Sequence, residues 1–184
     1  MARAALSTDA VVGIALRVLD EDGPGALTLS AVSGRAGVST PSLYKHVRNL
    51  AELRALVSAR IMNDLADQAG HAVLGRSADE AIRAFMTAWR SYARHHPHRY
   101  SALIQSPDPQ TAEAGARLID IITAALRAYG MEDSAAIHAA RCLRAAVHGF
   151  AVLEAQGGFG LPENLDDSYD LLIHVMIAGL RAPR

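Results

Sequence analysis

One short stretch of the chain carries polar side chains of the kinds that bind nucleic acid. They offer hydroxyl, phenol, ammonium and imidazole groups, which can bind phosphate oxygens and the edges of bases. Leu43 and Val47 stand at i, i+4 within this stretch, so the polar side chains lie off the apolar face of a predicted short helix. Lys45 is the only lysine in the chain. The outward residues are Thr40, Pro41, Ser42, Tyr44, Lys45 and His46.

A preceding short helix and a tight turn must position this segment. Apolar residues repeat at helical spacing before Gly37, and a glycine can adopt the positive φ with which many helices end. We expect Thr28 and Ser39 to cap the two helices, because a side-chain hydroxyl can accept from a free N–H of the first turn. Two short helices joined by such a turn predict a helix-turn-helix, whose second helix can enter a DNA major groove.

The residues from Thr28 to Val47 read T-L-x-x-V-x-x-x-A-G-V-S-x-x-S-L-Y-x-H-V, and L-x-E-L follows from Leu50. This pattern resembles the DNA-binding domain of the TetR family of transcriptional regulators. The resemblance implies a three-helix DNA-binding head and a following helix that acts as a lever, through which a ligand in the body changes the spacing of two recognition helices.

Three positions depart from the family pattern. Val47 stands where the family often has an aromatic residue, although valine also occurs. Ser33 stands where the family often has alanine, so its hydroxyl must bond back to a carbonyl or lie half-exposed. Leu50 stands where the family usually has a lysine that touches a phosphate. Leucine cannot make that contact, and we expect Arg48 to supply it instead.

DNA contacts are therefore expected along the second helix of the motif and at its flanks. Thr28 and Arg48 would position phosphates, and Ser30 would face the groove from the first helix. The full predicted set is Thr28, Ser30, Ser39, Thr40, Pro41, Ser42, Tyr44, Lys45, His46 and Arg48. Arg3 could also reach a phosphate.

Composition limits the class of protein. The chain has 184 residues, 51% of them hydrophobic, which is enough for a substantial core. Alanine and leucine are abundant and strand formers are scarce, which favours an all-α fold. Net charge is −1, but residues 1–60 hold seven basic and five acidic side chains, a net of +2. This asymmetry is consistent with a DNA-binding head on an acidic body.

Several classes are disfavoured. The chain has no G-x-S-x-G, P-loop or H-E-x-x-H motif, so we expect neither an enzyme nor a bound cofactor. Its apolar runs are too short to span a membrane and no signal peptide is visible, so we expect a cytoplasmic protein. Cys142 excludes an internal disulfide and is expected to be a buried, inert thiol. The preference for arginine over lysine favours a bacterial source with a GC-rich genome.

Helical periodicity divides the chain into two predicted domains. Residues 1–50 form the DNA-binding domain, beginning with a helix over 7–22, and a linker helix capped by Asn49 runs over 50–69. Residues 70–184 form a helical ligand-binding and dimerisation domain. In it, Ser77 and Glu80 predict a capping box. Helices are expected over 77–95, 98–105, 110–129 and 133–156, and from residue 166 onward.

The body carries a second resemblance. Trp89, the Y-A-x-x-H-P-x-x-Y run from Tyr92 to Tyr100, and the pair His148-Gly149 resemble a TetR-family C-terminal domain named for its tryptophan, histidine and glycine. The resemblance covers most of residues 77–181. It implies a regulator body but does not identify a ligand.

A ligand pocket is expected where the middle helices of the body converge. Such pockets are mostly apolar with a few polar groups that orient the ligand, and His148 is the best polar candidate. The same residues at helical spacing are equally consistent with plain core packing, with His148 bonded to a neighbour. The candidate wall is Phe85, Met86, Trp89, Tyr92, Leu103, Leu118, Ile122, Leu143, Val147, His148, Phe150 and Phe159.

A histidine-rich segment raises the possibility of a metal site. His95, His96 and His98 surround Pro97, which ends a helix, so their side chains point in different directions. Zinc ligands must converge on one point. We therefore expect no metal here.

The last two helices are apolar over much of their surface and are the predicted dimer interface, two from each subunit forming a four-helix bundle. The alternative is that they only complete the monomer core. The chain is thus predicted to be a homodimeric repressor that binds a palindromic operator in double-stranded DNA and is released by a small, mostly apolar effector. The competing hypothesis is a helical small-molecule-binding or scaffold dimer that does not bind DNA.

Overall fold

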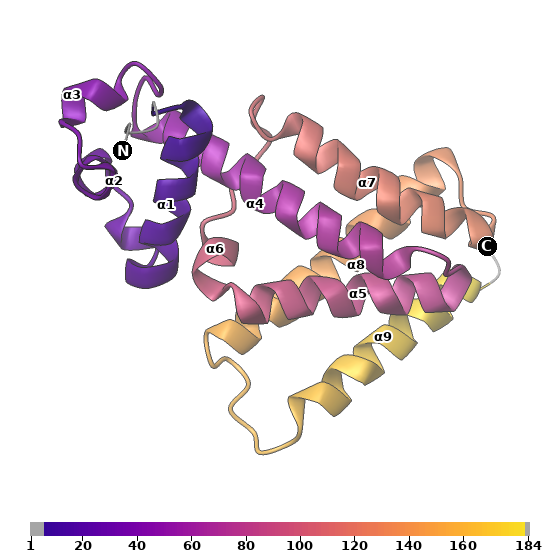
Figure 1. Ribbon diagram of the computed structural model, residues 1–184. Helices are drawn as coiled ribbons and strands as arrows, with labels where there is room; N and C mark the ends of the chain where they lie inside the picture. Colours follow the sequence, from indigo (N-terminus) through magenta and orange to yellow (C-terminus); the bar gives the residue numbers. More distant parts are fainter. Residues whose placement is uncertain (1–5, 183–184) are drawn as a thin grey trace. The chain divides into compact units, whose positions relative to one another are not determined.

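The computed structural model describes residues 6–182 and consists of helices joined by short connections (Figure 1). No strand occurs in this part of the chain, so the predicted all-α fold is confirmed. Arg3, a predicted phosphate contact, lies outside the described residues.

The N-terminal helices follow the predicted ones except at two helix ends. Helix α3 ends at Leu43, so Tyr44, Lys45 and His46 lie in a turn and not on the predicted second helix. Ser7 caps α1 by accepting from the Ala10 N–H at 3.1 Å, and Asn49 Oδ1 accepts from the Glu52 N–H at 2.9 Å at the start of α4. However, α4 does not end at the predicted boundary near Gly70 but continues for one more turn. The elements are α1 Thr8–Asp22, η1 Pro24–Ala26, α2 Leu29–Ala36, α3 Thr40–Leu43 and α4 Leu50–Val73.

The C-terminal helices also match, with two corrections. Ser77 occupies the N-cap position of α5 but makes no side-chain capping bond, so the predicted capping box is wrong. The helix predicted over 98–105 ends early, after a single turn and a half. The elements are α5 Ala78–His95, α6 Pro97–Ser101, α7 Ala112–Leu126, η2 Arg127–Tyr129, α8 Asp133–Ala155 and α9 Leu165–Arg181.

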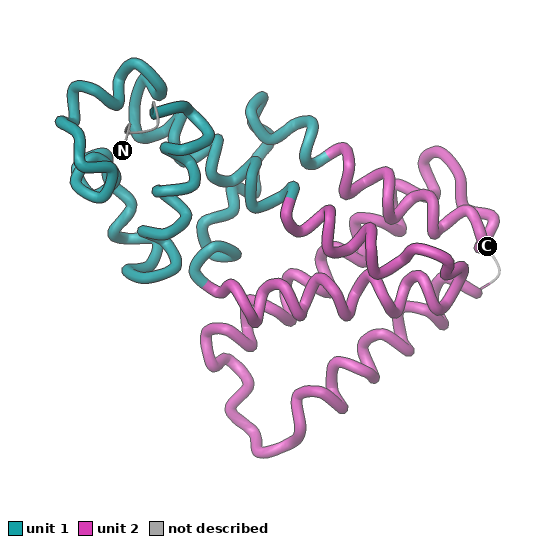
Figure 2. Tube along the Cα trace, in the orientation of Figure 1, with its two compact units in different colours: residues 1–63, 98–115 teal, residues 64–97, 116–184 magenta. Residues whose placement is uncertain are grey.

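The chain forms two compact units (Figure 2). Unit 1 comprises residues 1–63 and 98–115, and unit 2 comprises residues 64–97 and 116–184. Helix α4 contributes to both. The sequence-based division assigned all residues beyond 70 to the body, whereas the structure packs 98–115 with the N-terminal helices.

Polar contacts explain why residues 98–115 pack within unit 1. Arg99 forms a bidentate ion pair with Asp20 on α1, at 2.7 and 2.6 Å. The Ile104 N–H donates to Oγ of Ser58, a fully buried serine of α4, at 2.9 Å. These partners are distant in sequence, and no local pattern predicts them.

Each unit has its own apolar core. In unit 1, α1 buries Val11, Ile14, Ala15, Val18 and Leu19. In unit 2, α5 buries its whole predicted apolar side: Ile82, Phe85, Met86, Trp89 and Tyr92. Leu143 and Val147 of α8 and Ile173 of α9 are fully buried as well. No helix in the described part of the chain is long and apolar enough to cross a bilayer.

Cys142 is exposed, so the prediction of a buried thiol is wrong. The buried stripe of α8 includes Ala139, Leu143 and Val147. Cys142 precedes Leu143 by one residue and therefore points away from this stripe.

We predict that the free energy of unfolding depends on pH through His148. Partial burial lowers the pKa of His148 below its usual value, and the positive charge of Arg144 lowers it further. The unfolded chain thus binds more protons near the ordinary histidine pKa of about 6.5, so the free energy of unfolding should fall as pH drops through that value. In urea titrations, His148→Gln should weaken this pH dependence. An unchanged dependence would contradict the assignment.

Candidate nucleic-acid interface

The turn between α2 and α3 has the predicted geometry. Gly37 adopts a left-handed conformation with φ +65° and ψ +35°. The Val38 N–H donates to the Ser33 carbonyl at 3.1 Å, and Thr28 Oγ1 accepts from the Ala31 N–H at 3.1 Å. The predicted helix end at Gly37 and the predicted cap by Thr28 are confirmed, and the turn fixes the direction in which α3 leaves α2.

Helix α3 has only four residues, and its apolar side anchors it. Leu43 and Val47 are 0% and 1% exposed. The Val47 N–H donates to the Leu43 carbonyl at 3.0 Å, so the chain keeps turning beyond the regular helix. Isolated helices of this length are not stable in water, so burial of these side chains holds the segment in place.

The ten predicted DNA-contacting residues all belong to unit 1, and the structure leaves each at least partly accessible. Tyr44 is 54% exposed, which is high for an aromatic side chain. Thr28, Ser30, Ser39, Pro41, Lys45 and Arg48 are exposed, and Thr40, Ser42 and His46 are half-buried. The head therefore exposes a phenol and an ammonium in the turn after α3.

Ser33 is 4% exposed and joins α2 to α3. Its Oγ donates to the Ser30 carbonyl at 3.0 Å and lies 2.8 Å from Thr40 Oγ1. The prediction that its hydroxyl bonds back to a carbonyl is confirmed. Thr40 therefore has a partner within the protein, and its hydroxyl helps to orient the recognition segment.

Ser39 stands at the N-cap position of α3 with extended backbone, but its side chain makes no capping bond. Its Oγ instead lies 2.9 Å from Ser42 Oγ. The predicted hydroxyl cap is thus wrong, because the Ser42 hydroxyl, one turn along the helix, competes for the same group.

Arg48 is engaged by Glu52. Its Nε and Nη2 donate to Glu52 Oε1 at 3.1 and 3.0 Å, while its backbone N–H donates to Oε2 at 2.5 Å. These bonds hold the pKa of Glu52 below its usual range and raise that of Arg48. The Arg48 side chain is 78% exposed, so it can exchange this carboxylate for a phosphate. The sequence pattern did not anticipate this competition.

The N-terminus of α1 lies against the same segment. Thr8 Oγ1 donates to the His46 carbonyl at 3.3 Å. This contact between residues 38 positions apart was not predicted, since nothing in the local sequence distinguishes Thr8 from an ordinary first-turn residue.

The predicted ligand residues are mostly found in packed positions. Phe85, Met86, Trp89, Tyr92, Ile122, Leu143 and Val147 are buried in unit 2, and Leu118, His148 and Phe150 are half-buried there. Phe159 is 36% exposed and stacks on Phe150 at a centroid distance of 4.8 Å. Leu103 belongs to unit 1.

Each of the three histidines has a contact within its own unit. His95 Nδ1 lies 2.7 Å from the Ser91 carbonyl, His96 contacts the Tyr92 ring, and His98 Nδ1 lies 3.0 Å from the Leu19 carbonyl. Within residues 6–182, no three His, Cys, Asp or Glu side chains gather closely enough to hold a metal ion.

A small all-α head with an exposed polar recognition segment defines a helix-turn-helix, DNA-binding transcription regulator. Residues 13–55 match the family described as "Bacterial regulatory proteins, tetR family", and residues 82–176 match "Tetracyclin repressor-like, C-terminal domain". The chain belongs to the TetR family, whose members are typically not enzymes.

Curated relatives agree with this assignment. The uncharacterized HTH-type transcriptional regulator Rv0681 of Mycobacterium tuberculosis is 37% identical over 84% of this chain and 72% of its own length. The uncharacterized HTH-type transcriptional regulator YobS of Bacillus subtilis is 31% identical over 97% of this chain and 94% of its own.

Solved structures share the fold. BioQ with its double-stranded DNA operator matches with a TM-score of 0.74 and 22% identity, covering 97% of this chain and 100% of that one. A TetR variant from Acinetobacter baumannii AYE in complex with minocycline matches with a TM-score of 0.76 and 21% identity, with the same coverage.

The bond between Ser33 and Thr40 is expected to contribute about 1 kcal/mol of coupling to the free energy of unfolding. The variants Ser33→Ala, Thr40→Val and the double variant form a cycle that isolates this term in urea titrations. Ser33→Ala alone should cost little, because alanine is the better helix former by about 0.5 kcal/mol. A coupling of zero would mean that the two hydroxyls do not orient α3.

Proposed function

We propose that the chain is a homodimeric repressor that binds a palindromic operator through its helix-turn-helix and is released by a small, mostly apolar effector. The observation that carries the proposal is the exposed recognition segment. Tyr44 and Lys45 face solvent there, while Leu43 and Val47 beside them are buried. An exposed aromatic ring next to a cation has no role in the core and suits base edges and phosphates.

The proposed DNA contacts divide by chemistry. Tyr44, Lys45 and His46 follow α3 and can reach bases or phosphates, together with Ser39, Pro41 and Ser42. Thr28 and Ser30 approach from α2, and Arg48 binds a phosphate after releasing Glu52. Thr40 contacts DNA while its hydroxyl orients the segment through Ser33.

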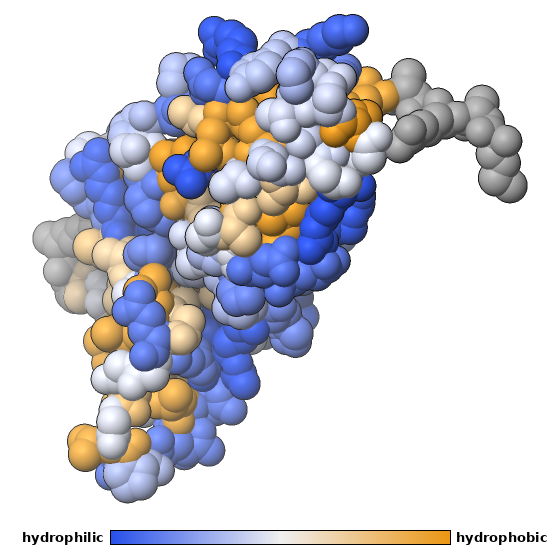
Figure 3. Space-filling model, turned by 90° about the vertical axis from the view of Figure 1, so that its left-hand side faces the viewer, coloured by the Kyte–Doolittle hydropathy of each residue, from blue (hydrophilic) through white to orange (hydrophobic). Residues whose placement is uncertain are grey.

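The proposed dimer surface is the apolar face that α8 and α9 leave uncovered. Leu153 on α8 is 46% exposed, and Leu171 and Val175 on α9 are 63% and 57% exposed. The connection between the two helices adds Leu161, at 77%. Hydrophobic residues are visible at the lower end of the molecule in Figure 3, where this connection lies. A second copy related by a two-fold axis would cover this face and suit a two-fold DNA site.

The effector would bind among the apolar residues of the body predicted to form its pocket. Support comes from the tetracyclin repressor-like C-terminal match and from the related fold that holds minocycline. By linkage, the effector and the operator must weaken each other's binding by the same factor. Such a regulator would act in the bacterial cytoplasm.

Salt dependence tests the DNA-binding proposal and separates it from the scaffold hypothesis. Affinity for random-sequence duplex DNA should fall steeply between about 50 and about 200 mM salt, because bound phosphates release counterions. Replacing Lys45 by methionine should lower the slope by about 1. Replacing the exposed Arg127 of unit 2 removes the same charge and should leave the slope unchanged. No binding even at low salt would favour the scaffold.

Substitutions on α9 test the dimer. Leu171→Asp with Val175→Asp places two charges on the proposed interface and should give a folded monomer in sedimentation experiments. Leu74→Asp is the control, because Leu74 is also an exposed leucine, at 72%, but lies outside α8 and α9. If the α9 variant stays dimeric, the interface lies elsewhere.

A further inference from the structure

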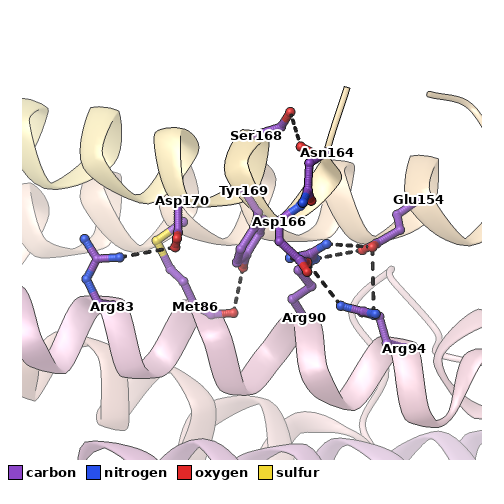
Figure 4. Close-up of polar contacts among 10 residues, drawn as sticks. All are labelled: Arg83, Met86, Arg90, Arg94, Glu154, Asn164, Asp166, Ser168, Tyr169 and Asp170. Atoms are coloured by element: carbon purple, nitrogen blue, oxygen red, sulfur yellow. Dashed lines mark hydrogen bonds and ion pairs between the residues drawn. The ribbon is translucent and has the colours of Figure 1, made fainter. Parts of the chain in front are cut away.

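Arg90 of α5 is a charged residue buried to 94%, and it lies where three helices of unit 2 meet (Figure 4). Its Nε and Nη2 donate to the two carboxylate oxygens of Glu154 on α8, at 2.8 and 2.7 Å. Its Nη1 lies 2.8 Å from Asp166 Oδ1, in the first turn of α9. The edges of one guanidinium thus join α5 to both of the other helices.

Two aromatic rings, themselves in contact, also lie beside the same guanidinium. Its central carbon lies 5.1 Å from the Phe150 ring centroid and 4.6 Å from that of Tyr169, which are themselves 4.8 Å apart. Arginine over an aromatic face is an attractive arrangement, and more so when water is excluded. We refer to Arg90, Glu154, Asp166, Phe150 and Tyr169 as the Arg90 clamp.

The first half of α9 depends on the Arg90 clamp more than the second half does. Between residues 165 and 172 only Tyr169 is buried, whereas Ile173, Ile177 and Leu180 anchor the second half. Tyr169 also donates its hydroxyl to the Met86 carbonyl on α5 at 2.6 Å. The preceding connection, which contains three glycines between residues 157 and 160, offers little stiffness of its own.

That first half of α9 carries part of the exposed apolar face. Leu171 lies on this half, and Leu153 on α8 and Phe159 in the connection are exposed as well. The first half also packs on α5, the helix that supplies Met86 and Trp89 to the proposed effector wall.

We propose that Arg90 is the positioning residue for the dimer surface, because it fixes the first half of α9 and the α8–α9 connection to α5. This inference rests on the proposed homodimer. Arg90 acts through Asp166 and Tyr169 and does not itself reach the exposed apolar face.

Two variants separate this role from simple core stability. Replacing both Arg90 and Glu154 by methionine substitutes apolar packing for the buried ion pair, which is often neutral for folding. It nevertheless removes the Arg90 contact with Asp166, the shortest ion pair between α5 and the first half of α9, while Arg94 still pairs with Asp166 and Arg83 with Asp170. The dimer dissociation constant should therefore rise about tenfold or more. Hydrogen exchange over residues 157–172 should accelerate in the same variant.

A matched pair on α9 provides the second comparison. Asp166→Asn should raise the dimer dissociation constant about two- to fivefold, the usual contribution of a partly exposed ion pair. Asp167→Asn removes the same charge from the same helical turn. Among residues 6–182, Arg90 and Arg94 pair with Asp166 and not with Asp167. The dimer dissociation constant of the Asp167→Asn variant should therefore stay near that of the wild type.

The outcomes distinguish the two levels of the proposal. A wild-type chain that stays monomeric at all concentrations overturns both the homodimer and this inference. The inference alone is overturned if the wild type is a dimer and the double-methionine variant, although folded, behaves like it. Such a variant would have the same dimer dissociation constant and the same protection from hydrogen exchange over residues 157–172.

Discussion

The proposed recognition of DNA depends on two buried side chains beneath a helix of four residues. Leu43 and Val47 have almost no exposed surface, and without their burial α3 is too short to persist. Gly37 sets the exit direction of the turn, and Ser33 ties α2 to Thr40. These three features together fix the segment from which the proposed DNA contacts project.

Charged groups are largely satisfied by neighbours within each unit, and this shapes both proposed activities. Arg48 is held by Glu52, so its proposed contact with a phosphate requires an exchange of one anion for another. Arg90 is held by Glu154 and Asp166 inside unit 2, where exchange with solvent is hindered. An arginine–carboxylate ion pair is thus exchangeable at the surface and fixed in the interior.

The sequence predicted what local rules determine: helix periodicity, the left-handed turn at Gly37 and the cap from Thr28. It failed where a side chain has several possible partners in space. Ser39 bonds to Ser42 instead of capping α3, and Ser77 makes no cap bond. Cys142 was misassigned because apolar neighbours in sequence do not imply burial, and this residue lies off the buried stripe of Leu143 and Val147 on α8. Whether the predicted contact residues touch DNA or an effector remains a prediction, because contacts with absent molecules are not encoded in packing.

The central claim, that the outward side of the α3 segment reads DNA sequence, is tested most directly by selection from random duplex DNA at near-physiological salt. The control is the variant with Tyr44→Ala and Lys45→Ala, which removes the two exposed groups and leaves Leu43 and Val47 in place. We predict that the wild type enriches a palindrome and that the folded control enriches none. Failure of the folded wild type, purified free of effector, to enrich any sequence even at low salt would contradict the account.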